Sequence, residues 1–145
     1  MGFTEWYCII GSLTEPHLTR YDCTLEGAFM EDGLKKLPAI FYRTPGGTEP
    51  VRDWLKDMPQ DDRQSLGHDI GFVEFGWPVG MPLCRSLGGG LWEVRSDLAS
   101  NRTARVIFCT AKGRMVLLHG FIKRTQKTPQ SDLALARKRQ KEIEQ

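Results

Sequence analysis

Five residues in the second half of the chain have side chains that could act together on a phosphate group. Arg95 ends the run LWEVR, Arg105 lies inside TARVIFCT, His119 lies inside MVLLHGFIK, and Lys123 and Arg124 close that last run. Arginine contacts phosphate through two parallel N–H donors, and lysine or histidine can move a proton when cationic neighbours lower its pKa. Cleavage of RNA without a metal needs a base for the 2′-hydroxyl, cations for the phosphorane and an acid for the leaving oxygen. These five residues are therefore the candidate catalytic set.

The runs that carry them predict three strands of an antiparallel meander. Each is short, rich in Val, Ile, Leu and aromatic residues, and bounded by polar segments that turn easily. Side chains two apart share a face of a strand, so Trp92 and Val94 lie opposite Glu93 and Arg95. We expect one face to pack in a core, and an open face to carry Arg95 beside Arg105. Surface ion pairs with Glu93 are the alternative role for these arginines, and such pairs contribute little to stability.

The last strand can present either of two alternating sets of side chains to that open face. An inward-facing histidine, hydrogen-bonded within the core, is as consistent with the pattern as a catalytic one. The first set holds His119, Phe121 and Lys123, and the second holds Gly120, Ile122 and Arg124.

Charge is distributed unevenly along the chain. Residues 101–145 hold 11 Lys or Arg against 3 Asp or Glu, a net charge of +8, whereas residues 1–100 hold 9 against 15, a net charge of −6. A basic C-terminal third indicates a polyanionic partner such as single-stranded RNA, with Phe121 or Trp77 stacking on a base. A solvated basic helix is the alternative. The candidate RNA-binding cations are Arg85, Lys127, Arg137, Lys138 and Arg139.

The remaining patterns predict an α+β domain. The order is a strand, two helices, four strands and a helix, which gives a helical hairpin packed on a twisted antiparallel sheet and a basic C-terminal helix. Glycines inside the second helix cost helix propensity, so we expect close packing at Gly67 and Gly71. The expected elements are a strand at 38–44, a helix from the N-cap Thr48 to 58, a helix from 60 to 76, a strand at 82–87, the meander, and a helix at 130–144 capped by Ser131.

Composition sets the class of protein. The 145 residues are 40% hydrophobic and 26% charged, as expected for one globular domain. No apolar run approaches the roughly 20 residues of a membrane helix and no secretory signal is present, so we expect a cytoplasmic protein with no membrane partner. The four cysteines form no CxxC pair, so we expect reduced thiols, no metal site and no cofactor. Residues 1–36 show no sustained period and are expected to extend outside a domain at 37–145.

The runs SLGGGLWEVRSD, RTARVIFCT and MVLLHGFIKRTQKTPQSD, leading into a basic helix, resemble the phage-derived HigB-like toxins of the RelE/ParE superfamily. The resemblance covers Pro38 to Glu144, and LLHGFIKRTQKTP is its most specific part. It implies a small α+β domain that is the toxin of a type II toxin–antitoxin pair. The implied activity is metal-independent, ribosome-dependent cleavage of mRNA. The alternatives are a gyrase-poisoning toxin of the ParE branch and a non-catalytic, phage-derived nucleic-acid-binding protein.

The resemblance also implies partners and site residues. The expected partners are a helix-turn-helix antitoxin similar to HigA, the ribosome and mRNA. Several ribosome-dependent relatives place a tyrosine near the C-terminus of the active face, whereas the tyrosines here are Tyr7, Tyr21 and Tyr42. His119 is the candidate replacement. The positions that match the family signature are Arg95, Arg105, His119, Lys123, Arg124 and Lys127.

Overall fold

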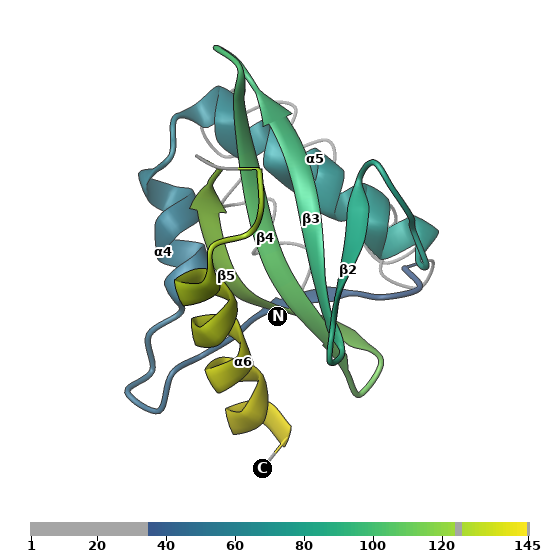
Figure 1. Ribbon diagram of the computed structural model, residues 1–145, viewed down its shortest axis with the longest axis vertical. Helices are drawn as coiled ribbons and strands as arrows, with labels where there is room; N and C mark the ends of the chain where they lie inside the picture. The colour runs from purple at the N-terminus through teal and green to yellow at the C-terminus, as the bar shows by residue number, and fades with distance from the viewer. Residues whose placement is uncertain (1–34, 124–125, 145) are drawn as a thin grey trace, which may run out of the picture.

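The computed structural model describes residues 35–123 and 126–144, and its elements follow the expected α+β order (Figure 1). Most of the expected extension at 1–36, with Cys8 and Cys23, lies outside the described residues. Within the described ranges, no helix is both long and apolar enough to cross a membrane. The elements are β1 (Ala39–Phe41), α4 (Pro50–Asp57), α5 (Gln60–Gly76), β2 (Cys84–Gly88), β3 (Leu91–Leu98), β4 (Arg102–Ala111), β5 (Arg114–Ile122) and α6 (Gln130–Glu144).

The strands form one five-stranded sheet in the order β1-β5-β4-β3-β2. Strands β3 to β5 make the expected three-stranded antiparallel meander, and β2 pairs antiparallel to β3 beside it. The expectation of a wholly antiparallel sheet is wrong for β1, which pairs parallel to β5 with Ile40 opposite Val116. Both helices and three strands separate β1 from β5 in sequence, so no tight turn fixes their relative direction.

The helical hairpin covers one face of the sheet. Leu66, Ile70 and Val73 of α5 are fully buried against Val94, Val106 and other inward residues, as the helical spacing predicts. The two helices lie behind the sheet in Figure 1. This core places the meander on a rigid support.

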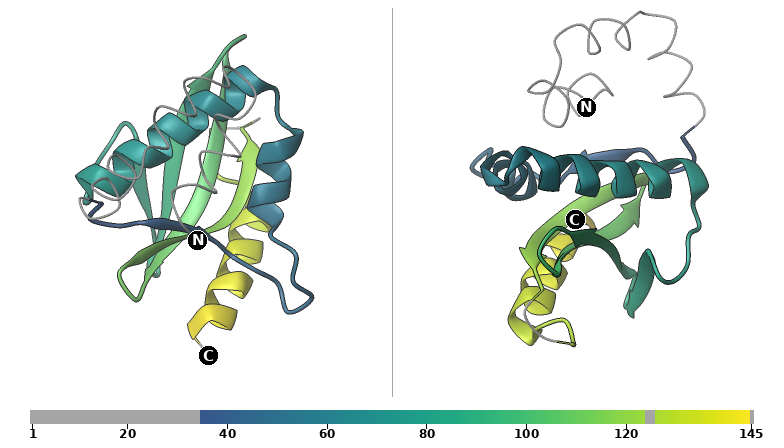
Figure 2. Two further views of the ribbon diagram at one scale, coloured as in Figure 1. Left: turned by 180° about the vertical axis from the view of Figure 1, so that it is seen from behind. Right: turned by 90° about the horizontal axis from the view of Figure 1, so that it is seen from above.

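The second face is not open, and that expectation is wrong. Helix α6 packs across β4 and β5, on the side of the sheet opposite α5 (Figure 2). It buries Ala136 against a second apolar cluster that includes Ile107 and Leu118. The runs VIFC at 106–109 and MVLL at 115–118 are apolar at every position, and strands of that kind are buried on both faces.

Two helix starts differ from the expected caps. Helix α4 has Glu49 as its N-cap, one residue after Thr48, because Pro50 takes the first helical position that its fixed φ favours. Helix α6 already begins at Gln130, so Ser131 lies inside its first turn. Three consecutive glycines predict a tight turn at Gly88–Gly90, and this turn is confirmed, since all three have positive φ.

Two glycines differ sharply in the space around them. Gly120 of β5 faces α4, and a Cβ built there would lie 2.4 Å from two ring carbons of Trp54. In α5, Gly67 is buried. The expectation of close packing is wrong for Gly71, because nothing lies within 4 Å of a Cβ built there. Contact between an aromatic ring and the backbone therefore explains the glycine in β5, and Gly71 has no such constraint.

Replacing Gly120 by Ala should lower the free energy of unfolding by about 1–3 kcal/mol or more, because the Trp54 ring must move. The matched variant Gly71→Ala should be neutral or stabilising by up to about 1 kcal/mol through helix propensity. Chemical denaturation of both variants measures the difference. Equal stabilities for the two would contradict the close approach of Trp54 to β5.

Candidate functional site

Strand register places three arginines in a row on the face that α6 partly covers. Arg85 pairs with Glu93 across β2 and β3, and Arg95 pairs with Arg105 across β3 and β4. Because Phe121 pairs with Arg105, β5 presents the set with His119 and Phe121 on this face, and Lys123 follows directly after the strand. The second of the two sets faces the helical hairpin instead, and Arg124 lies outside the described residues.

Arg105 is the most buried member of the row, with 1% of its side chain exposed. The expectation that it projects from an open face is wrong, because the segment leading into α6 covers it. Its Nη1 lies 3.4 Å from Glu93 Oε1 and donates to Thr128 Oγ1 at 3.0 Å, while Nη2 donates to the Gln126 carbonyl at 3.3 Å. Burial lowers the pKa of Arg105, and Glu93 opposes that shift. The guanidinium is thus fixed between a strand and a loop.

Glu93 connects these groups. Its carboxylate is fully buried and accepts hydrogen bonds from Arg95 Nε at 3.1 Å and from the Thr128 hydroxyl at 2.6 Å. A buried carboxylate needs such partners, since an unpaired charge in this place would be strongly destabilising. One side chain therefore holds two arginines from adjacent strands and ties the start of α6 to the sheet.

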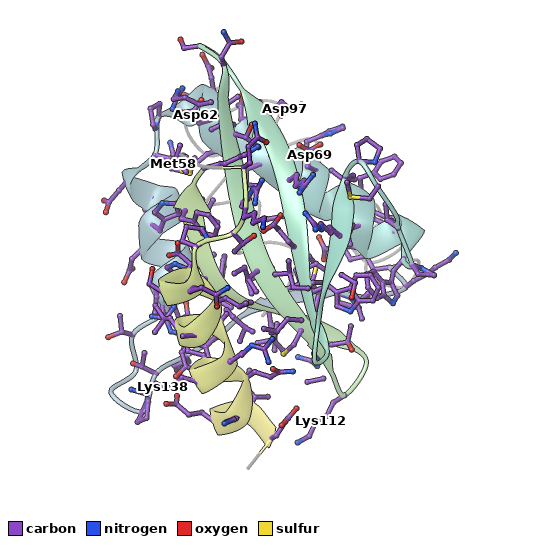
Figure 3. The ribbon with its side chains drawn as sticks, in the orientation of Figure 1. Met58, Asp62, Asp69, Asp97, Lys112 and Lys138 are labelled. Carbon is purple, nitrogen blue, oxygen red and sulfur yellow. The ribbon has the colours of Figure 1, made fainter. Side chains whose placement is uncertain are left out.

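An open depression of about 450 Å³ lies beside this cluster, where β3 runs on past the first residue of β2. Arg95, which is 22% exposed, contributes cationic lining beside Lys123. Asp69 and Asp97 contribute carboxylates, and both are labelled in Figure 3. The full lining is Asp69, Pro82, Leu83, Arg95, Asp97, Thr103, Arg105 and Lys123.

His119 lies apart from this depression. Its Nε2 is 2.6 Å from Asp132 Oδ1 in the first turn of α6, and its ring stacks on Phe121 at 5.7 Å. His119 and Lys123 are four positions apart, or about 13 Å along an extended chain. The side chain is 19% exposed, so the alternative of a partly buried, hydrogen-bonded histidine fits its surroundings. The structure thus brings together Arg95, Arg105 and Lys123 but not His119.

The candidate RNA-binding cations divide into two kinds. Arg139 is engaged within the fold, because Nη1 donates to the Leu118 carbonyl at 2.6 Å and the guanidinium lies 5.5 Å from the centre of the Tyr42 ring. Leu118 has no partner in the β4–β5 register, which shifts between Ile107 and Phe108. Exposed side chains form the second kind, and these are Arg85, Lys127, Arg137 and Lys138.

The described cysteines do not add chemistry to the site. Cys84 and Cys109 are free and buried, and burial raises the pKa of each thiol to about 11. At neutral pH both are protonated and poor nucleophiles. Among the described residues, no group of three or more His, Cys, Asp or Glu side chains is placed to hold a metal ion.

Two residues of the cluster have positions that the sequence pattern does not predict. The strand pattern indicates a surface ion-pair partner at Glu93, whereas the residue is buried under the segment that leads into α6. The runs at 106–109 and 115–118 are apolar at every position, and this pattern is the sequence signal that both faces of β4 and β5 are covered. Asp69 has no local signal, because it reaches the depression from α5 through the fold alone.

Glu93→Ala should lower the free energy of unfolding by about 3–5 kcal/mol, because it leaves the Arg105 charge buried and unpaired. The double variant Glu93→Leu with Arg105→Met should recover most of that loss, since apolar residues of similar size replace the whole pair. Denaturant titration of the two variants tests this. A single variant as stable as the wild type would show that the pair is not a structural requirement.

A family model matches the greater part of the chain. Residues 53–141 match the family model described as "Phage derived protein Gp49-like (DUF891)". The matched range is well over half of the chain and extends from α4 into α6, so it includes the whole arginine row and the depression. No curated protein matches the chain.

Proposed function

The chain belongs to the phage-derived Gp49-like family, a RelE/ParE-like family of toxins in toxin–antitoxin systems, and on this premise we propose that it stops translation by cleaving mRNA on the ribosome. In this proposal it is a metal-independent endoribonuclease similar to HigB toxins. The observation that carries the proposal is the depression, where Arg95, Arg105 and Lys123 meet one carboxylate from α5 and one from β3.

Arg95 and Lys123 are the proposed contacts to the scissile phosphate. The carboxylate of Glu93 accepts a hydrogen bond from the Nε of Arg95. The two Nη groups of Arg95 have no hydrogen-bond partner among the described residues. These groups can donate in parallel to phosphate oxygens and stabilise the phosphorane. Lys123 lines the same depression, and its ammonium can protonate the leaving 5′-oxygen. Arg124, next in the chain, remains a proposed third cation.

The 2′-hydroxyl proton needs an acceptor in the same place. We assign it to Asp69, whose Oδ2 accepts a hydrogen bond from the Ser96 hydroxyl at 2.5 Å. The 2′-oxygen then attacks phosphorus and the bond to the 5′-oxygen breaks, leaving a 2′,3′-cyclic phosphate and a 5′-hydroxyl. The distance of His119 from Lys123 favours a different role for it, so we propose the His119–Phe121 stack as a platform for a neighbouring base.

Arg105 has a supporting part in this proposal. It adds positive potential beneath the depression and keeps the segment at 126–128 in place. The exposed cations Arg85, Lys127, Arg137 and Lys138 are the proposed contacts to the wider RNA or ribosomal surface. The proposed regulatory partner is a helix-turn-helix antitoxin similar to HigA, encoded beside the toxin.

Induction of the protein in bacteria should arrest growth, with protein synthesis falling before DNA synthesis does. Depletion of mRNA on ribosomes acts directly on translation and only later on replication. Pulse labelling with methionine and thymidine measures the order. An early fall in DNA synthesis with an SOS response, while translation continues, would instead support the gyrase-poisoning alternative.

Arg95→Ala and Lys123→Ala should each lower the rate of mRNA cleavage about 10²-fold, as the loss of one preorganised transition-state contact does. Arg95→Lys should restore only part of the rate, because a point charge cannot reproduce the two-pronged contact. Arg114→Ala is the matched control, since that exposed arginine lies at the start of β5, away from the depression. Primer extension on a reporter mRNA gives the rates. Folded Arg95 and Lys123 variants that retain full cleavage would refute the assignment.

A further inference from the structure

We propose that the depression beside β3 recognises guanine, with the Asp97 carboxylate accepting hydrogen bonds from the N1 and N2 donors of the base. The inference rests on the proposed function, because it identifies the nucleotide that this RNA-cleaving site would prefer. It concerns a part of the depression to which the cleavage chemistry assigns no role.

The charges in the depression are arranged for two different groups of one ligand. Arg95 and Asp97 are two residues apart on β3, so their side chains share a face and their Cα atoms are about 7 Å apart. Thr103, opposite Asp97 on β4, donates to Asp97 Oδ1 at 3.3 Å and orients the carboxylate. The Oδ2 atom has no hydrogen-bond partner among the described residues. A phosphate on Arg95 therefore leaves an oriented carboxylate within reach of the attached nucleoside.

The depression also offers a surface for the flat face of a base. Pro82 and Leu83 form its apolar wall, and the Arg95 backbone N–H donates to the Leu83 carbonyl at 2.8 Å, which fixes that wall against β3. Its volume of about 450 Å³ falls within the usual range for small-ligand sites. One nucleotide can be held by cations at one end, an apolar wall beside it and a carboxylate at the other end.

The chemistry of a carboxylate decides which base fits. An ionised Asp is an acceptor only, with two oxygens that can receive parallel hydrogen bonds. Guanine has two adjacent donors, N1–H and N2–H₂, on its Watson–Crick edge. Adenine and cytosine place an acceptor beside their amino group, and uracil places acceptors on both sides of its single donor. Those acceptors would oppose the carboxylate oxygens, so guanine is the base that matches Asp97.

The test is a nuclear magnetic resonance titration of the full-length protein with each of the four ribonucleoside 5′-monophosphates, without ribosomes. Guanosine monophosphate should bind at least about 10-fold more tightly than the other three, as expected for one well-formed bidentate contact. Asp97→Asn should bring the four dissociation constants to within about 3-fold of one another, because the amide replaces one acceptor with a donor. Arg95→Ala should weaken binding of all four nucleotides by a similar factor.

The matched control is Asp61→Asn, at an exposed acidic position in the first turn of α5, which should leave all four constants unchanged. Equal affinities for the four nucleotides, no measurable binding of any, or a guanine preference that survives Asp97→Asn would each overturn the inference. Because the titration needs no cleavage, a guanine preference in a protein that cuts no mRNA would refute the proposed function and leave this inference standing. Cleavage without any base preference in the titration would do the reverse.

Discussion

The buried ion pair between Glu93 and Arg105 is the constraint on which the site depends. The register of β3 and β4 sets Arg95 directly beside Arg105, and two like charges in that position repel each other. Glu93 lies on the same face and bonds both, so the pair can be held in place without a ligand. Because Glu93 compensates the buried charge of Arg105, the cations that an anionic ligand can reach in the depression are Arg95 and Lys123.

The same carboxylate links the site to the C-terminal helix. Thr128 and Gln126 contact the cluster just before α6 begins, and the helix is then held by the contacts of Arg139 with Leu118 and of Asp132 with His119. Arg139 therefore serves packing, whereas the neighbouring cations Arg137 and Lys138 remain exposed to a partner. The helix packs mainly on β4 and β5 and reaches the β2–β3 turn through Gln140, and the depression beside β3 stays open.

Membership of the Gp49-like family indicates the class of protein. The geometry of the site indicates the chemistry that the protein could perform. Members of the family are commonly toxins of toxin–antitoxin systems. The depression suggests how such a toxin could act, because cations, carboxylates and an apolar wall lie within the dimensions of one nucleotide. Phosphate contacts of this type carry affinity, whereas specificity depends on the edge of the base. Arg95 and Asp97, two residues apart on one strand, would divide those tasks.

The sequence by itself determined the features that depend on neighbours along the chain. The order of the elements, the bounds of α6, the turn at Gly88–Gly90 and the shared face of Arg95 and Arg105 follow from a period of two, a period of 3.6 and turn chemistry. Only the tertiary structure decided which set of β5 side chains faces Arg105, the direction of β1, and the burial of Glu93 under the start of α6. Those outcomes depend on contacts between segments far apart in sequence, and a strand pattern specifies two faces without specifying what will cover each one.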